Sequence, residues 1–135
     1  MVSQAVECKR LVALRLNPGD DVLISLRAAV KEHGIQNGFF LGGAGSVSRY
    51  RAHVVATTNL PPGDIFFEQE GPFDILDVTG LIIEGRVHAH IVLSNATGAC
   101  GGHLEEGTRV LTFAAIVIAD TPEADLAQWD SLKEL

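Results

Sequence analysis

Residues 84–93 have the sequence EGRVHAHIVL, in which polar and apolar side chains alternate from Arg86 onward. Successive side chains of a β-strand point to opposite faces of the sheet, so this pattern predicts a half-buried strand over residues 86–93. The apolar members share the face that suits a core. The polar members, which include His88 and His90, share the other face.

Several other segments have strand composition, being rich in aliphatic and β-branched residues and bounded by turn residues. They are residues 9–16, 47–57, 65–70, 73–84 and 109–118. Between the first two, Val22, Leu26, Ala29, Val30 and His33 follow one another at helical spacing. Asp20 can serve as the helix N-cap and Gly34 stands where a C-terminal glycine belongs, so we expect an amphipathic helix over residues 21–33.

One helix and about six strands, with no linker and no internal repeat, predict a single α+β domain with a mostly antiparallel sheet. We place this domain at residues 8–119. We expect residues 1–7 to be flexible and residues 120–135 to form an acidic C-terminal tail.

Glycines 42, 43 and 45 resemble a phosphate-binding loop only superficially. The residues that follow them are predicted as strand and not as a helix whose N-terminus could hold phosphate. The lysine and hydroxyl pair of a P-loop is also missing. The glycines therefore indicate a tight bend or a β-bulge where two backbones approach closely.

Charge argues against nucleic acid as a partner. The chain of 135 residues carries 10 lysines and arginines against 17 acidic residues, a net charge of −7, and the cations are scattered. A basic footprint is the expected sign of phosphate-backbone binding, and an anionic membrane surface would also repel this chain. We expect an acidic, solvated surface.

The compartment predicted from the sequence is the reducing cytoplasm. Two cysteines, Cys8 and Cys100, cannot build a disulfide framework. No apolar run near Met1 suits a signal peptide, and the longest nearly uninterrupted apolar run, residues 113–119, is far too short to span a bilayer.

The main candidate site is a metal centre. His88 and His90 project from the same strand face, about 7 Å apart at their Cα atoms, so their imidazoles can converge on one ion. His103 is the natural third ligand, because the turn-rich residues 94–98 let the chain fold back and Gly101-Gly102 allow close approach. Three protein ligands and a water form an open, catalytic type of zinc site. Neutral imidazoles suit zinc, iron, copper or nickel, and do not suit magnesium or calcium.

Further polar residues near these histidines have open roles. Cys100 could add a sulfur ligand, although a small buried thiol is the commoner fate of a cysteine. Glu105 and Glu106 could orient a ligand imidazole, act as a general base, or simply be surface acids. Arg86 could pair with an anionic substrate or with a nearby acid such as Glu84. We assign no ligand role to His33, at the helix end, or to His53, in a strand without an evident partner.

An ordered set of motifs resembles the PPC (plants and prokaryotes conserved) domain family over roughly residues 8–119. The set comprises Pro18-Gly19-Asp20 with its helix, residues 42–47, Gly71-Pro72-Phe73-Asp74-Ile75-Leu76, Gly80, residues 85–93, Gly98 and Gly101-Gly102-His103-Leu104. Asp74 stands where the family usually has glutamate. The histidines at 88, 90 and 103 match the prokaryotic type.

The resemblance implies an α+β fold, a homotrimer and a DNA-binding label that comes from plant members with an AT-hook. The Arg-Gly-Arg-Pro core of that hook is absent here. Apolar strand residues, such as Phe66, Phe67, Phe73 and Phe113, also favour association.

Three functions remain open. The first is a trimer whose metal site, with zinc or another transition metal, binds or acts on a small anionic molecule. The second is a DNA-associated regulator, although the charge argues against DNA binding by the isolated domain. The third is a trimer whose metal only stabilises the fold.

Overall fold

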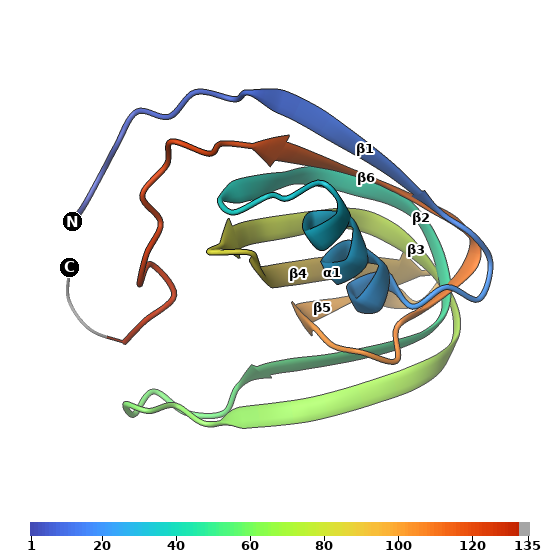
Figure 1. Cartoon of the computed structure of the whole chain (residues 1–135). Helices are drawn as coiled ribbons and strands as arrows, with labels where there is room; N and C mark the ends of the chain where they lie inside the picture. The colour runs from blue at the N-terminus through green and yellow to red at the C-terminus, as the bar shows by residue number, and fades with distance from the viewer. Residues whose placement is uncertain (133–135) are drawn as a thin grey trace.

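Two long strands, β2 (Gly38–Val55) and β3 (Asp64–Ile83), form an antiparallel hairpin that bends through the molecule (Figure 1). The computed structural model describes residues 1–132. The remaining elements are β1 (Arg10–Leu16), α1 (Val22–Glu32), β4 (Arg86–Asn95), β5 (Gly98–Leu104) and β6 (Arg109–Asp120). The strands pair in the order β1-β6-β2-β3-β4-β5. An additional pairing between β2 and β5 closes the last four strands on themselves.

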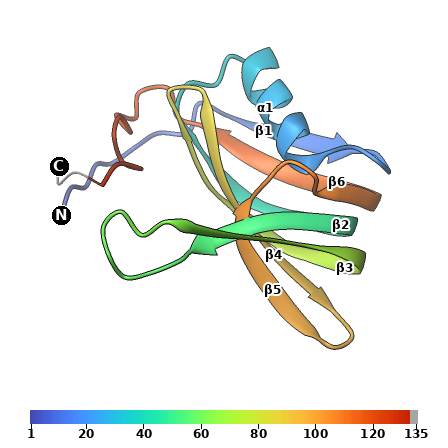
Figure 2. The same ribbon diagram turned by 90° about the horizontal axis from the view of Figure 1, so that it is seen from below.

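The strand pairings are antiparallel throughout the described residues, and a single helix accompanies them. The predicted α+β domain is therefore confirmed. Helix α1 lies against one side of the sheet (Figure 2). Its apolar stripe is buried there, and consists of Val22, Leu23, Leu26, Ala29 and Val30.

The predicted N-cap of α1 is wrong by one residue. The Oδ1 atom of Asp21 accepts a hydrogen bond from the Ile24 amide at 3.1 Å, which satisfies a donor of the first helical turn. Asp20 instead accepts from the amide of Asn17 at 2.8 Å and closes the preceding turn. The other end agrees with prediction, because Gly34 follows the helix with a φ of +64°.

The six strands also differ from those expected. Residues 65–70 and 73–84 were predicted as two strands, but residues 64–83 form the single strand β3, and Glu84 lies in the turn that follows. The Gly71-Pro72 pair falls at a register shift against β2 and does not end the strand. A proline can remain in a strand at such an irregularity, where no ladder hydrogen bond is required of it. The strand β5 was not predicted, since residues 98–102 are mostly small.

Glycine 45 forms the predicted close approach. It has a φ of +145°, and a Cβ at this position would lie 2.1 Å from the carbonyl oxygen of Phe113. Register shifts flank it in the pairing of β2 with β6. The segment is thus a bulged strand and not a phosphate-binding loop.

A second, smaller core lies beside the main one. Ile83, Ala124 and Leu126 are buried together, and Trp129 packs against them. Part of the segment expected as an acidic tail therefore contacts the sheet, while residues 133–135 lie outside the described part. Within residues 1–132, no helix combines the length and the apolar character that crossing a membrane requires.

Candidate metal centre

The three predicted histidines meet on one face of the sheet. His88 and His90 come from β4, and His103 comes from β5 directly opposite His90. The ring centroid of His103 lies 4.7 Å from that of His88 and 5.5 Å from that of His90, and the rings of His88 and His90 are 5.4 Å apart. One ligand nitrogen from each residue lies within 4.8 Å of the others. This arrangement could hold a metal ion.

Gly102 makes room for His103. A Cβ at this position would lie 2.7 Å from the carbonyl oxygen of His53 in β2, so a larger residue would push β5 away. Because β5 lies between β4 and β2, His103 is opposite His90 on one side and opposite His53 on the other. The close approach of two backbones that was predicted for Gly101-Gly102 therefore occurs at Gly102, between β5 and β2.

His53 is part of the same cluster, which the sequence did not indicate. Its ring centroid lies 4.4 Å from that of His103. Its Nδ1 atom is 2.7 Å from Glu105 Oε1, and its Nε2 atom is 3.6 Å from Asp64 Oδ1. Only the long-range pairing of β2 with β5 brings His53 here, and no local pattern reports that pairing.

The environment favours the neutral form of at least two of the imidazoles. Burial, aided by the nearby histidines 53, 88 and 90, lowers the pKa of His103 to about 4. The pKa of His90 is also lowered, first by burial and then by His88. Neutral imidazole is the form that binds metal, so these shifts fit a ligand role.

His103 also has an unused buried atom. Its Nδ1 is buried and lacks a hydrogen-bond partner among the described residues. Buried polar groups are normally paired, so this exception requires an explanation such as an ion. A pocket of about 490 Å³ opens beside the cluster, lined by His53, Val54, Val55, His88, His90, Gly102 and His103.

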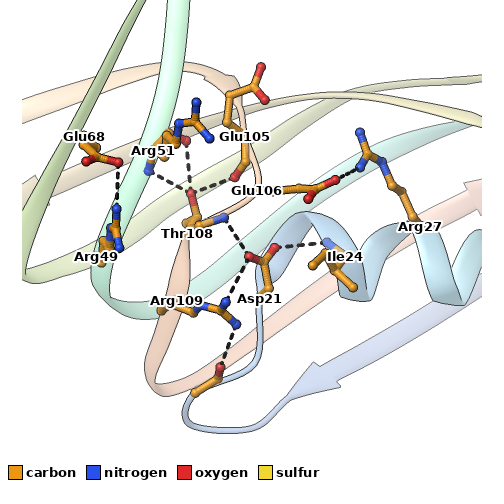
Figure 3. A network of polar contacts seen from close by, with 12 residues as sticks. Asp21, Ile24, Arg27, Arg49, Arg51, Glu68, Glu105, Glu106, Thr108 and Arg109 are labelled. Atoms are coloured by element: carbon orange, nitrogen blue, oxygen red, sulfur yellow. Dashed lines mark hydrogen bonds and ion pairs between the residues drawn. The ribbon is translucent and has the colours of Figure 1, made fainter.

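Of the two glutamates considered as candidates, only Glu105 reaches the cluster. Figure 3 shows that the Glu106 side chain instead points toward Arg27 of α1, with which it forms an ion pair. Thr108 anchors the loop that carries both glutamates. Its Oγ1 atom lies 3.2 Å from the Glu105 carbonyl oxygen and accepts from the Arg51 amide at 3.0 Å.

Two other candidates lie elsewhere. Arg86 forms an ion pair with Asp130 at 3.1 Å and does not line the histidine pocket. Cys100 is opposite Leu93 and packs against the main core. It lies three positions before His103, and residues three apart on a strand face opposite ways, so its thiol is on the other face from the histidines. It joins none of the metal-ligating groups of the described residues. His33 forms the C-cap of α1, far along the chain from the cluster.

Comparisons with known proteins support the fold. The family model of the Plants and Prokaryotes Conserved (PCC) domain matches residues 3–122. The bifunctional protein GlmU of Synechococcus sp. (strain JA-2-3B'a(2-13)) is 33% identical over 115 residues, which make up 84% of this chain. The chain spans 17% of the length of that protein.

Solved structures have the same fold. A hypothetical protein from Salmonella cholerae-suis, at 27% identity, gives a TM-score of 0.75 with 88% of this chain and 82% of that chain covered. A metal-containing protein from Archaeoglobus fulgidus, at 22% identity, gives a TM-score of 0.77, with 92% of this chain and 89% of that chain covered. A protein from Bacteroides thetaiotaomicron with a provisional DNA-binding description, at 17% identity, gives a TM-score of 0.72, with 88% of this chain and 83% of that chain covered.

Proposed function

The chain belongs to the Plants and Prokaryotes Conserved domain family, and from this membership and the histidine geometry we propose that it is a homotrimeric metal-binding protein. In this proposal His88, His90 and His103 hold one transition metal ion, with zinc as the first choice. The ion faces a pocket in which the protein binds, or acts on, a small anionic molecule.

The observation that carries the proposal is the convergence of three imidazoles from two adjacent strands, with donor atoms within 4.8 Å of one another. Imidazole nitrogen is a preferred ligand of zinc and of several other divalent transition metals. The lowered pKa of His103 and that of His90 support the same proposal, because neutral imidazole is the form that binds metal.

The pocket supports an anionic ligand when a metal ion is bound. Its lining within residues 1–132 includes no arginine and no lysine, and the pKa of His103 and that of His90 are lowered, which favours uncharged rings. A bound divalent ion would therefore be the main positive charge that a ligand meets. Such an ion attracts an anionic oxygen and, when bound, acts as a Lewis acid toward it. Val54 and Val55 give the pocket an apolar wall.

Glu105 and His53 would act beside the ligands. The carboxylate of Glu105 lies 2.7 Å from the Nδ1 atom of His53, and the His53 ring packs edge to face against His103. Carboxylates paired with histidines commonly fix the ring orientation near a metal. In this role Glu105 limits the movement of His53, which in turn limits the movement of the His103 ring.

Cobalt substitution tests the metal and its ligand together. The protein is loaded with one equivalent of Co²⁺, and its visible absorption is followed while acetate or phosphate is added. We expect a saturable spectral change in wild type and in His33→Ala, whose altered residue lies at the C-cap of α1. We expect no such change in His88→Ala. A wild-type spectrum that no anion alters would contradict the anionic ligand, and failure to bind Co²⁺ would contradict the metal site.

The trimer rests on the family resemblance and on exposed apolar residues. Phe66 and Phe113 are 53% and 43% exposed, whereas Phe73 is buried and Phe67 packs against the core. Only two of the four phenylalanines considered in the sequence are thus available for association. Leu41, Leu76 and Val92 are exposed as well. Sedimentation equilibrium at micromolar concentration should give about three times the monomer mass of 14.4 kDa, and a monomer would refute the trimer.

DNA binding is the second candidate, favoured by the provisional description of the Bacteroides thetaiotaomicron structure. Several of the arginines are already paired with acids, as in Arg27 with Glu106, Arg49 with Glu68 and Arg86 with Asp130. A purely structural metal is less favoured, because structural zinc usually has four protein ligands. Within residues 1–132 the first group supplies three.

A further inference from the structure

A second group of metal-ligating side chains overlaps the first. It consists of His53, His103 and Glu105, whose candidate donor atoms lie within 4.8 Å of one another. The two groups share His103 and differ in their other members. The second contains two imidazoles and one carboxylate, a set that is known in zinc enzymes and in non-haem iron(II) sites.

The fold places the two groups on opposite sides of His103. His90 is opposite His103 across the β4–β5 ladder, and His53 is opposite it across the β2–β5 ladder. A neutral imidazole ring has one bare nitrogen and one N–H. A histidine between two such neighbours can bind one ion through each nitrogen, with the ring proton released to solvent when the second ion binds. The Nδ1 atom of His103 has no protein partner among the described residues and is available for this purpose.

The second group is also held in position. Thr108, which is fully buried, bonds to the backbone on both sides of the site, at Arg51 and at Glu105. The Glu105 amide donates to the carbonyl oxygen of Arg51 at 3.1 Å, which continues the pairing beyond β5. The carboxylate of Asp64 lies 3.6 Å from the Nε2 atom of His53 and adds further negative charge nearby.

We propose that His53, Glu105 and the shared His103 form a second site for a divalent transition metal ion, beside the three-histidine site. The proposal of a second site rests on the proposed function, because both sites use His103. The second site is the weaker one, because an ion already bound to His103 repels another close by, and the carboxylate of Glu105 offsets this repulsion only in part. The protein therefore keeps one ion after dialysis and takes up a second when free metal is supplied.

Equilibrium dialysis against buffered free Zn²⁺, followed by elemental analysis, tests the second site. Wild type and the control His33→Ala should retain one equivalent at low free Zn²⁺ and approach two at higher free Zn²⁺. His53→Ala and Glu105→Gln should retain the first equivalent and lose the second. Glu105→Gln keeps the shape of the side chain, so it separates ligation from packing. Circular dichroism checks that each variant is folded.

The failure of this proposal and the failure of the proposed function give different results. A wild type that never exceeds one equivalent, or a second equivalent that survives both His53→Ala and Glu105→Gln, would overturn the second site and leave the first intact. A wild type that retains no zinc at low free Zn²⁺ would overturn the three-histidine site. His88→Ala should lose the tight equivalent and still bind one ion at higher free Zn²⁺.

Discussion

Acidification should destabilise the metal-free protein, and His103 should carry a large part of the effect. Burial, aided by the nearby histidines, lowers its pKa from 6.5 to about 4. The unfolded chain therefore takes up this proton near pH 6.5, whereas the folded chain takes it up only near pH 4. Between these values the unfolded state holds more protons. The free energy of unfolding therefore falls as the pH falls through this interval, and the loss is complete near pH 4.

The magnitude follows from the size of the shift. One pKa unit corresponds to about 1.4 kcal/mol, so a decrease from 6.5 to about 4 sets an upper value of about 3 kcal/mol. Solvent reaches the pocket and screens part of this effect, which leaves about 2 kcal/mol for the contribution of His103.

Urea denaturation followed by far-ultraviolet circular dichroism measures this contribution. Wild type, His103→Gln and His33→Gln are compared in chelator at about pH 7 and about pH 4.5, at one fixed protein concentration. His33 is the matched control, since it is an exposed histidine at the end of α1. On acidification, the free energy of unfolding of wild type and of His33→Gln should fall by about 2 kcal/mol more than that of His103→Gln. Equal losses in all three proteins would refute the reasoning.

Three other changes have expected outcomes. Gly45→Ala should lower the free energy of unfolding by more than about 2 kcal/mol in urea denaturation, because the new Cβ would lie 2.1 Å from a carbonyl oxygen of β6. Its control is Gly98→Ala, where a Cβ would have nothing within 4 Å, and the free energy of unfolding of this variant should stay within about 0.5 kcal/mol of wild type. Leu126→Ala should lower the free energy of unfolding by about 2–4 kcal/mol in the same assay, since this side chain is fully buried. Leu132→Ala, at an exposed position, is its control, and equal losses in the two variants would contradict the second core. Fluorescence anisotropy with A·T-rich and random duplexes should show no binding tighter than about 10⁻⁶ M at ~150 mM salt, and a tighter, salt-sensitive isotherm would favour the regulatory function.

Local patterns predicted the parts of the fold that depend on neighbouring residues. The alternation around His88 and His90 fixed their common face, because strand side chains repeat every two residues whatever lies beyond the strand. Helix α1 was predicted for the same kind of reason, from apolar residues at helical spacing with Gly34 after them.

Features that depend on distant segments were missed. Residues 98–102 have little strand propensity, and they form β5 because β4 supplies a hydrogen-bonding edge along their length, while β2 pairs with the end of the strand at His103 and Leu104. His53 is paired with Glu105, 52 positions away in the sequence, so no window around either residue could indicate the contact. Glu106 was a candidate only through its position, and its ion pair with Arg27 depends on where α1 packs.

The central claim is that His88, His90 and His103 bind a transition metal, and metal content after dialysis tests it most directly. Elemental analysis of wild type and of His33→Ala should give close to one equivalent of zinc or another transition metal per chain. His88→Ala, His90→Ala and His103→Ala should each lose most of this tightly bound metal while circular dichroism shows a folded protein. Full retention of the metal in all three of these variants would contradict the account.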